Sequence, residues 1–255
     1  MCSRLAFPAV PLPRPADKQQ ARYYQQPYLV SLFNGMASSY EGMNYLTSFG
    51  FSYVWRRQFL QPLPPLQGAV KVADLMTGMG EMWPHLFAKW PRAQVEALDF
   101  SEGMLQCAAR KNRRTFANRV QLIKADALRS PLPSMSYDVV TCAFGLKTLS
   151  REQLLCLARE TKRLLKPGGH FAFVEISEPA PGWLQALYLF YLKHLIPLIG
   201  YCFAQDYHHY QMLSYYTHAF RNAEEAAEIF KAEGLAVTYQ QLFKGCATGF
   251  YGTKP

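Results

Sequence analysis

Short apolar runs alternate with amphipathic segments through the middle of this chain. Five runs of six to eight residues have the length and composition of buried strands, and they cover Val70–Leu75, Gln94–Asp99, Val120–Ala125, Tyr137–Ala143 and Gly169–Ile176. Segments with helical spacing lie between them, at Glu81–Lys89, Ser101–Asn112 and Ser150–Leu165. Because strands and helices alternate, the pattern predicts an α/β fold in which a mostly parallel sheet carries helices on both faces.

One helix and two more strands complete the pattern at the C-terminal end. The helix is expected at Ala223–Glu233, and the strands are expected at Leu235–Leu242 and Ala247–Thr253. The sequence therefore predicts a seven-stranded sheet.

The segments outside the alternating region divide into an arm and two helical caps. Residues 1–27 are rich in Pro, Gln and basic side chains and lack apolar periodicity, so we expect a flexible arm. Residues 28–60 have helical spacing, and a long apolar insertion follows the fifth strand. We expect residues 28–255 to form one domain, in which residues 28–60 form an N-terminal helical element and residues 181–220 form a helical lid.

The insertion contains the most apolar stretch of the chain, Trp183 to Ala204. Lys193, His194 and Pro197 interrupt it before about twenty apolar residues accumulate, so a membrane-spanning helix is not expected. Such a stretch suits a lid over an apolar pocket or a peripheral contact with a membrane surface. Residues 1–15 lack the continuous apolar centre of a signal peptide, so we expect a cytoplasmic protein that is not exported.

Charge and cysteine spacing argue against several kinds of site. The formal net charge is +9, and the densest basic run, Arg110 to Arg114, falls at the end of a predicted surface helix without a nucleic-acid-binding motif. We therefore expect a solvated helix face and no nucleic-acid partner. The six cysteines are scattered, with neither disulfide-type nor zinc-type spacing, so no metal site is expected.

A glycine-containing turn, DLMTGMGE at residues 74–81, follows the first strand. Gly78 and Gly80 in this turn allow the backbone to approach a ligand closely. Asp99 ends the second strand, nineteen residues after Gly80, where a carboxylate can accept both hydroxyl hydrogens of a ribose. Trp83 stands where a dinucleotide motif needs its third glycine, which disfavours a NAD or FAD site.

Two further turns reach the same edge of the expected sheet. Asp126 follows the third strand, where it can bind an adenine amino group, and Ala143–Phe144 ends the fourth strand. Ligands of open α/β sheets bind at the carboxyl ends of the strands, so the four turns are expected to line one crevice.

Together these segments resemble the class I methyltransferases that use S-adenosylmethionine (SAM), and the resemblance narrows to the ubiquinone/menaquinone-type C-methyltransferases over about residues 28–253. FNGMASSY at residues 33–40, followed by Met43 and Asn44, resembles the family signature F-x-x-x-A-x-x-Y-D-x-M-N. AFGLK at residues 143–147 resembles the motif S/A-F-G-L-R-N, and residues 165–169 match L-K-P-G-G. The insertion parallels the I-P-x-I-G segment with IPLIG at residues 196–200.

The resemblance implies a Rossmann-like class I methyltransferase with SAM as cofactor and a small-molecule methyl acceptor. The residues that it implies for the cofactor site are Tyr40, Asp74, Gly78, Met79, Gly80, Asp99, Phe100, Met104, Asp126, Ala127, Ala143 and Phe144.

Candidate catalytic residues lie on the acceptor side of the expected crevice. Lys147 follows the fourth-strand motif, where its charge would stabilise an oxyanion on the acceptor. His208 and His209 are candidate general bases, with Asp206 and Tyr210 close by in sequence. Bulky apolar side chains in the insertion suit an apolar aromatic, quinone-like or polyketide-like acceptor, and C-methylation of such a ring is the favoured reaction.

Departures from the family pattern keep other functions open. Thr77-Gly78-Met79-Gly80-Glu81 replaces the family's G-G-T-G-D turn, and Lys147-Thr148 replaces its Arg-Asn. The alternatives are an O- or N-methyltransferase of secondary metabolism and a non-methylating relative such as a SAM-binding cyclase. The oligomeric state is open as well, with a homodimer among the alternatives.

Overall fold

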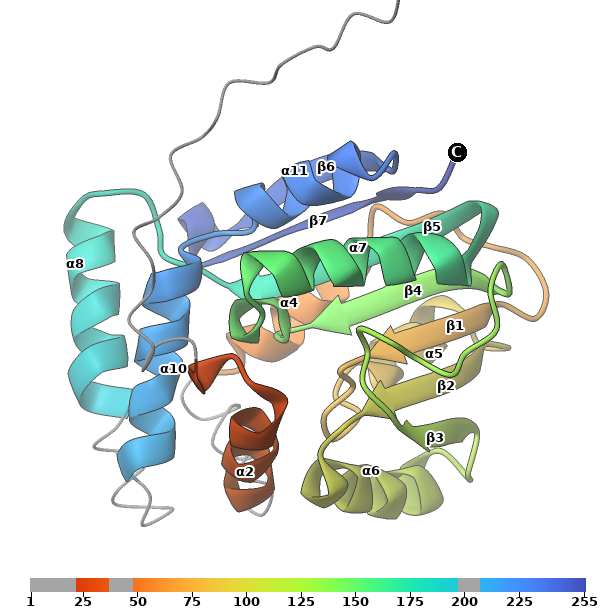
Figure 1. The fold of residues 1–255 in the computed structure, drawn as a ribbon, viewed down its shortest axis with the longest axis horizontal. Helices are drawn as coiled ribbons and strands as arrows, with labels where there is room; N and C mark the ends of the chain where they lie inside the picture. Colours follow the sequence, from red (N-terminus) through yellow and green to blue (C-terminus); the bar gives the residue numbers. More distant parts are fainter. Residues whose placement is uncertain (1–21, 37–47, 197–206) are drawn as a thin grey trace, which may run out of the picture.

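A seven-stranded sheet with the order β3-β2-β1-β4-β5-β7-β6 forms the centre of the computed structural model, which describes residues 22–36, 48–196 and 207–255 (Figure 1). The strands are β1 (Lys71–Leu75), β2 (Gln94–Asp99), β3 (Val120–Lys124), β4 (Tyr137–Ala143), β5 (Leu165–Ile176), β6 (Ala236–Leu242) and β7 (Ala247–Thr253). Only β7 runs in the opposite direction to the other six strands of this sheet. The predicted mostly parallel sheet is therefore confirmed.

Six of the seven strands begin and end within one residue of their predicted bounds, whereas β5 begins four residues early, at Leu165. The difference has a local cause. The β4–β5 register shifts between Tyr137 and Val139, and this β-bulge accommodates Pro167 and Gly168 within the strand. Turn-type residues at this point therefore mark an irregularity of β5, although the sequence pattern assigns them to a loop.

The strand order reverses between β1 and β4, which are neighbours in the sheet although β2 and β3 lie between them in sequence. Val72 pairs with Val139 and Asp74 with Thr141, so the turns that follow the two strands start side by side. This reversal is the point at which ligands of open α/β sheets bind.

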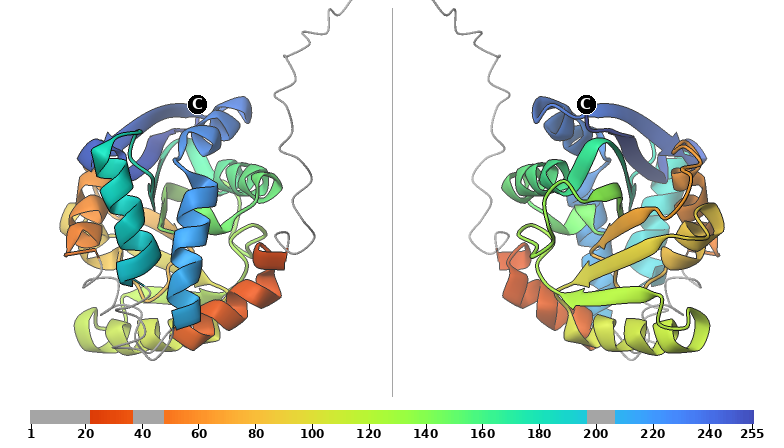
Figure 2. Two further views of the ribbon diagram at one scale, coloured as in Figure 1. Left: turned by 90° about the vertical axis from the view of Figure 1, so that its left-hand side faces the viewer. Right: turned by 90° about the vertical axis from the view of Figure 1, so that its right-hand side faces the viewer.

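Helices cover both faces of the sheet, as predicted (Figures 1 and 2). On one face lie α7 (Arg151–Leu164) and α11 (Glu224–Ala232), and on the other lie α4 (Phe51–Leu60), α5 (Trp83–Lys89) and α6 (Glu102–Thr115). α7 begins at a capping box, in which the Ser150 hydroxyl accepts the Gln153 N–H and the Gln153 side chain accepts the Ser150 N–H. Local capping thus sets the start of this helix.

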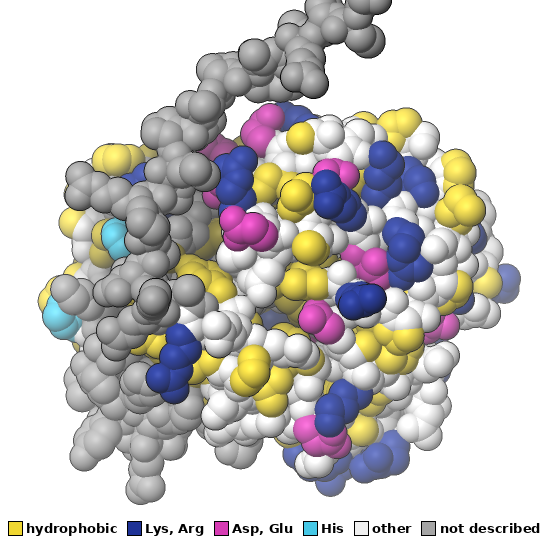
Figure 3. All heavy atoms as spheres, in the orientation of Figure 1, with side chains coloured by type: hydrophobic (Ala, Val, Ile, Leu, Met, Phe, Trp, Pro, Cys, Tyr) yellow, Lys and Arg dark blue, Asp and Glu magenta, His cyan; other side chains and the backbone are white. Residues whose placement is uncertain are grey.

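The outer surface of α7 and α11 carries both signs of charge. Figure 3 shows Lys and Arg side chains intermixed with Asp and Glu on this face. Arg151 Nη1 lies 2.7 Å from Glu225 Oε1, and Arg159 Nε lies 3.2 Å from Glu233 Oε1. The described part of this face therefore presents paired charges.

Four helical elements lie beyond the carboxyl ends of the parallel strands (Figure 1). They are α2 (Gln26–Met36), α8 (Trp183–Phe190), the π-helical segment η2 (Tyr191–Leu195) and α10 (Tyr207–Phe220). Leu29, Leu32 and Met36 of α2 pack with Leu192, Met212 and Tyr216 from the other elements. Segments from both ends of the chain thus meet over the switch point. No helix in the described ranges is long and apolar enough to cross a membrane.

The start of this N-terminal element corrects the expected boundary of the arm. The sequence predicts a flexible arm over residues 1–27, but residues 22–27 contact the rest of the molecule. The Tyr216 hydroxyl donates to the Tyr23 carbonyl at 2.6 Å, and Gln153 Nε2 donates to the Tyr24 carbonyl at 3.0 Å. Tyrosine rings have no regular spacing here, so a periodicity argument does not detect their packing. Residues 1–21 lie outside the described ranges.

Candidate active site

Two strained turns touch each other at the switch point. Met76 after β1 and Phe144 after β4 both have positive φ, at 52° and 65°, a conformation that costs energy for residues other than glycine. A Cβ on Gly145 would lie 2.8 Å from Met76 Sδ, so the absence of a side chain at Gly145 lets the turns meet. Such outliers cluster at ligand sites, and these two border a common cavity.

Asp74 fixes the shape of the first turn from beneath. Its carboxylate is buried and accepts hydrogen bonds from the Thr77 hydroxyl at 2.5 Å and the Thr141 hydroxyl at 2.8 Å. Burial raises the pKa of Asp74 to about 6, against the opposing effect of these hydrogen bonds. The indole of Trp83 donates to the same Thr77 oxygen at 3.0 Å. Thr77, a departure from the family pattern, is therefore part of a closed polar network.

Asp99 lies at the end of β2 and faces the turn across a short gap. Its Oδ2 accepts the Gly78 N–H at 2.9 Å, and its Oδ1 accepts the Ser101 N–H at 2.8 Å. Burial raises the pKa of Asp99 to about 6, partly offset by these backbone hydrogen bonds. Each carboxylate oxygen can accept a second hydrogen bond, so the arrangement fits a ribose diol.

Helix α2 contacts the turn that follows β2, residues 99–104, which we call the acidic turn. Asn34 Oδ1 accepts hydrogen bonds from the Ser101 hydroxyl at 2.7 Å and the Gly103 N–H at 2.9 Å. Ser101 is also the N-cap of α6, because its hydroxyl accepts the Met104 N–H at 3.2 Å. The N-terminal signature thus positions the Asp99–Ser101 turn, and its Phe33 ring lines the cavity.

We use the name cofactor cavity for the space between these turns. It is lined by Phe33, Arg56, Met76, Thr77, Gly78, Glu81, Asp99, Phe100, Met104, Ala143, Phe144, Gly145 and Thr148. Six residues of the predicted cofactor site are among them: Gly78, Asp99, Phe100, Met104, Ala143 and Phe144. Tyr40 lies outside the described residues, and the remaining five, Asp74, Met79, Gly80, Asp126 and Ala127, do not line the cavity.

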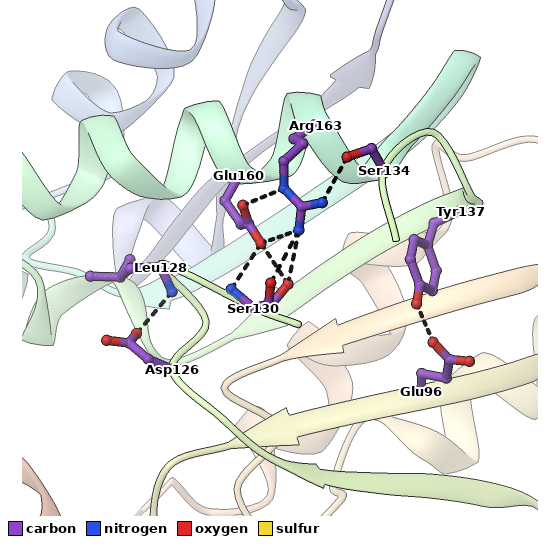
Figure 4. A network of polar contacts seen from close by, with 8 residues as sticks. All are labelled: Glu96, Asp126, Leu128, Ser130, Ser134, Tyr137, Glu160 and Arg163. Atoms are coloured by element: carbon purple, nitrogen blue, oxygen red, sulfur yellow. Dashed lines mark hydrogen bonds and ion pairs between the residues drawn. The ribbon is translucent and has the colours of Figure 1, made fainter. Parts of the chain in front are cut away.

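Packing and local hydrogen bonds explain where these five residues lie. Asp74 is beneath the turn, and Met79 packs against Met104. A Cβ on Gly80 would lie 2.6 Å from the Trp83 ring, so this glycine makes room for Trp83. Asp126 Oδ1 accepts the Leu128 N–H at 2.9 Å, and Ala127 is buried in the core (Figure 4).

The loop that carries Asp126 is anchored to α7. Glu160 Oε1 accepts the Ser130 N–H at 3.0 Å, and Arg163 Nη2 lies 2.7 Å from the same carboxylate oxygen (Figure 4). Arg163 Nη1 donates to the Ser134 hydroxyl at 2.8 Å. This network holds the loop against the helix, which limits how far Asp126 can move towards the cavity.

Two charged residues of the cofactor cavity were not expected from the sequence. Arg56 of α4 is buried and Glu81 after β1 is partly buried, with Arg56 Nη2 3.9 Å from Glu81 Oε1. The Arg56 guanidinium also lies 4.5 Å from the centre of the Phe144 ring. A signal for Arg56 was available, since it occupies the buried helical stripe formed by Ser52, Trp55, Arg56, Phe59 and Leu60.

A second space, which we name the apolar cavity, adjoins the first and has a volume of about 380 Å³. Its walls come mainly from α4, α8 and η2, and they include Phe51, Trp55, Leu184, Leu187, Leu192 and Ile196. Arg56 and Phe144 line both cavities and so mark the boundary between them. Tyr188 also lines this cavity, where burial raises the pKa of its phenol and the hydroxyl can donate a hydrogen bond.

Lys147 lies in the wall of the apolar cavity, paired with a buried carboxylate. Its Nζ lies 2.6 Å from Glu175 Oε1 and 3.3 Å from the Phe144 carbonyl. The Lys147 N–H donates to Glu175 Oε2 at 3.1 Å. Of the other catalytic candidates, His208, His209 and Tyr210 belong to the first turn of α10, with side chains outside those described, and Asp206 is outside the described residues.

The arrangement joins a polar cavity suited to a nucleoside with an apolar cavity suited to a hydrophobic acceptor. The Asp99 carboxylate and the turn at Gly78, where φ is +58°, fit the ribose of SAM. Transfer of a group from a polar donor molecule to an apolar acceptor across the Arg56–Phe144 boundary is the chemistry that this geometry supports.

Comparison with known proteins gives a consistent result. The model of the ubiE/COQ5 methyltransferase family matches residues 21–254. The demethylmenaquinone methyltransferase of Listeria welshimeri is 32% identical over 227 residues, which cover 88% of this chain and 94% of the relative. The structure of a SAM-dependent methyltransferase from Aquifex aeolicus matches with a TM-score of 0.55 at 20% identity. The match covers 78% of this chain and 89% of the Aquifex chain. The structure of phosphoethanolamine N-methyltransferase 2 of Haemonchus contortus in complex with SAM matches with a TM-score of 0.56 at 15% identity. This match covers 88% of this chain and 60% of the Haemonchus chain.

Proposed function

Because the chain belongs to the ubiE/COQ5 methyltransferase family and is a SAM-dependent methyltransferase, we propose that it methylates a ring carbon of an apolar, quinone-like acceptor. The Listeria welshimeri relative is a demethylmenaquinone methyltransferase, and the similarity covers nearly the whole of both chains. A reduced quinone ring with an apolar tail is therefore the acceptor class that we propose here.

The observation that carries this proposal is the contact between the two cavities. Phe144 and Arg56 line both, so a molecule in the apolar cavity lies directly next to the cofactor cavity. Aliphatic and aromatic side chains make up most of the walls, which suits a ring with a hydrocarbon tail. Charged small substrates would lose their hydration there without regaining hydrogen bonds.

Residues of the chain have to hold the acceptor, exclude water and stabilise negative charge. SAM, when bound, supplies an electrophilic methyl group, and in-line attack on it needs close positioning more than covalent help. Lys147 Nζ carries three hydrogens and uses two for Glu175 and the Phe144 carbonyl. We assign the third to a hydroxyl oxygen of the acceptor, where the positive charge favours the oxyanion and so the nucleophilic ring carbon.

The hydroxyl proton needs an acceptor. His208 and His209 stay the proposed bases, with Asp206 and Tyr210 as their neighbours, because α10 borders the loop that carries Lys147. After transfer, the methylated ring carbon loses its hydrogen as a proton to solvent, which restores the aromatic ring, and the protonated base returns the first proton to the ring oxygen.

An exposed apolar rim surrounds the apolar cavity, and we propose that it contacts a membrane surface from which the acceptor enters. None of the eight residues of α8, WLQALYLF, is buried. Trp183 is 75% exposed, and Phe190 is 55% exposed while also lining the cavity. Phe49 and Phe243, which also line the cavity, are exposed as well. Such a rim allows an apolar acceptor to pass from a bilayer into the cavity without crossing water.

A comparison of acceptors tests this proposal. Purified protein is incubated with methyl-labelled SAM and one of three reduced acceptors: a prenylated naphthoquinol without a ring methyl, the same naphthoquinol without the prenyl chain, and a catechol. We expect methyl transfer to the prenylated naphthoquinol with the lowest KM. Leu184→Trp, which fills the apolar cavity, should raise this KM, while Val54→Trp, an exposed control on α4, should not. Preferred turnover of catechol would contradict the proposal.

A further inference from the structure

Arg56 and Glu81 each have one buried polar side-chain atom that makes no hydrogen bond within the described residues. Arg56 Nε and Glu81 Oε1 are buried without a hydrogen-bond partner among the described residues. The two side chains approach each other, but the 3.9 Å between Arg56 Nη2 and Glu81 Oε1 is too long for a hydrogen bond. Buried polar atoms are nearly always paired in native proteins, so each of these atoms points to a missing partner.

Both residues are otherwise held in place. Arg56 Nη1 donates to the Ser52 carbonyl at 3.3 Å, and its guanidinium lies over the Phe144 ring. Glu81 Oε2 accepts the Met79 N–H at 3.2 Å. One end of each charged group is therefore fixed by the protein, while the other is left available. This is the arrangement expected of a preorganised receptor for a ligand that carries both charges.

The position of the pair within the cofactor cavity indicates which part of a ligand it would meet. Asp99 and Phe100, at the end of β2, form the side of the cavity suited to a nucleoside. Arg56 and Phe144 form the side that adjoins the apolar cavity. A SAM molecule whose ribose lies at Asp99 has to place its methyl group towards the acceptor, and its amino-acid end then lies on the same side as Arg56 and Glu81.

We propose that Arg56 and Glu81 bind the zwitterionic amino-acid end of SAM, Arg56 through the α-carboxylate and Glu81 through the α-ammonium group. A guanidinium presents donors in a fork that matches a carboxylate, and a free carboxylate oxygen accepts from an ammonium. The ligand would satisfy both unpaired atoms at once. This inference rests on the assignment of the cavity to SAM and adds to it the recognition of its amino-acid end.

Arg56 also borders the apolar cavity, so the competing role is binding of the acceptor. The two roles differ in which ligand responds to a change at Arg56. A role towards SAM alters affinity for S-adenosylhomocysteine in the absence of any acceptor, whereas a role towards the acceptor alters only KM for the acceptor.

Calorimetric titration with a set of nucleosides tests the proposal without turnover. S-adenosylhomocysteine carries both charges, 5′-deoxy-5′-(3-aminopropylthio)adenosine keeps only the ammonium group, and 5′-deoxy-5′-methylthioadenosine has neither. Arg56→Gln and Glu81→Gln should each weaken S-adenosylhomocysteine binding by about 10- to 100-fold, the range for hydrogen bonds to charged groups. Both variants should bind methylthioadenosine within about threefold of the unchanged protein.

The aminopropyl compound distinguishes the contact of Arg56 with the α-carboxylate from the contact of Glu81 with the α-ammonium group. Glu81→Gln should weaken its binding, and Arg56→Gln should not. Arg57→Gln, the neighbour of Arg56 that lines neither cavity, is the matched control and should bind all three nucleosides normally. Arg56→Lys keeps the charge and should retain part of the affinity for S-adenosylhomocysteine.

Two results would overturn the inference. Equal weakening of all three nucleosides would mean that the substitutions disturb the cavity as a whole. Unchanged affinity of Arg56→Gln and Glu81→Gln for S-adenosylhomocysteine would mean that the pair does not meet the amino-acid end. Either result would leave SAM binding itself intact, because that is shown separately by titration of the unchanged protein.

Discussion

Lys147 and Glu175 form a buried ion pair in the wall of the apolar cavity, with Nζ 2.6 Å from Oε1 and only 7% and 0% of the side chains exposed. Glu175 also accepts the backbone N–H groups of Lys147 and Ile176. The pair thus joins the turn after β4 to the end of β5, and it holds the amine that we place next to the acceptor.

Loss of one partner should therefore destabilise the fold. Lys147→Met leaves the Glu175 carboxylate buried without its counter-charge, and we expect the free energy of unfolding in urea to fall by about 3–5 kcal/mol. Lys147→Met combined with Glu175→Gln removes both charges and should recover most of that loss. Arg151→Met, at an exposed pair on α7, is the control and should cost less than about 1 kcal/mol. A loss for Lys147→Met no larger than this control would rule out a structural role.

The double variant also tests the proposed role of Lys147 in turnover. If the amine stabilises the oxyanion of the acceptor, the refolded double variant should bind S-adenosylhomocysteine normally and lose about 100-fold or more in kcat. Normal kcat in this stable variant would show that Lys147 has only the structural role.

Cofactor affinity should depend on pH through Asp99. Burial raises the pKa of Asp99 to about 6, and the ribose hydroxyls need the ionised form as acceptor. A proton competes with the ligand below that value, so the Kd for S-adenosylhomocysteine should rise from pH 7.5 to pH 5, by up to about tenfold per pH unit below 6. Asp74 has a pKa of about 6 as well, but it does not line the cavity. Asp99→Asn should abolish the pH dependence, whereas Asp74→Asn should retain it.

Stability of the ligand-free protein should change in the opposite direction. The pKa values of Asp74 and Asp99 are raised above the ordinary value of 3.8, so folding favours their protonated forms. Their contribution to stability is fully present below about pH 4 and is lost as the pH rises through 6. Asp99→Asn should flatten this part of a urea-unfolding profile measured between pH 4 and 7, and an unchanged profile would argue against the raised pKa.

Asn34 is expected to control the order of the acidic turn. Asn34→Ala removes the acceptor for the Ser101 hydroxyl and the Gly103 N–H, so hydrogen exchange of residues 99–104 should become faster. The cost in stability should be about 1 kcal/mol, because the residue is exposed and water can replace part of the lost hydrogen bonding. Ser31→Ala, an exposed control on the same helix, should leave exchange of residues 99–104 unchanged. Equal exchange in both variants would contradict the role of α2.

We expect a side chain at position 145 to clash with Met76 as long as Met76 is not replaced by a smaller residue. Gly145→Ala would place a Cβ 2.8 Å from Met76 Sδ, and the overpacking should cost about 1–3 kcal/mol of folding free energy and weaken cofactor binding. Adding Met76→Ala makes room for the new methyl group and should restore part of both. Failure of the second substitution to compensate, in urea unfolding and calorimetry, would show that the two turns do not press on each other.

Membrane binding should depend on the rim of the apolar cavity. Leu187→Glu or Phe190→Glu should reduce co-flotation with phosphatidylglycerol-containing vesicles by about 10-fold or more, since burying one such side chain contributes about 1.5–3 kcal/mol. Met135→Glu changes an exposed apolar residue just before β4, at the amino ends of the parallel strands and away from the apolar cavity. This control should not alter flotation. Similar losses for all three variants, or no flotation of the unchanged protein, would contradict membrane contact.

The sheet was predictable because its strands are short apolar runs separated by amphipathic helices. The place of Asp99 in the lining of the cofactor cavity was predictable as well, from its position at the end of the second strand, nineteen residues after Gly80. Residues 22–27 were misplaced because their packing uses tyrosine rings and backbone carbonyls, as in the Tyr216–Tyr23 hydrogen bond, and neither leaves a periodic trace. The bulge in β5 depends on pairing with β4, which is information from a distant part of the chain.

The site was harder to predict where function depends on contacts between distant segments. Gly80 follows the glycine pattern, but only the structure shows the Trp83 ring in the place of its Cβ. Arg56 stands on a buried helical stripe, which hinted at a role, but its approach to Glu81 joins residues 25 positions apart. Lys147 was expected near the acceptor, and its pairing with Glu175 required knowledge of the β4–β5 contact.

The most direct test of the central claim is to determine which atom receives the methyl group. A prenylated naphthoquinol without its ring methyl is incubated with the protein and SAM carrying a ¹³C-methyl group, and the product is examined by ¹³C NMR. We predict a single enriched signal in the region of methyl groups on aromatic carbon. An enriched signal in the methoxy region, or no enriched product from protein that binds S-adenosylhomocysteine, would contradict C-methylation of a quinone-like acceptor.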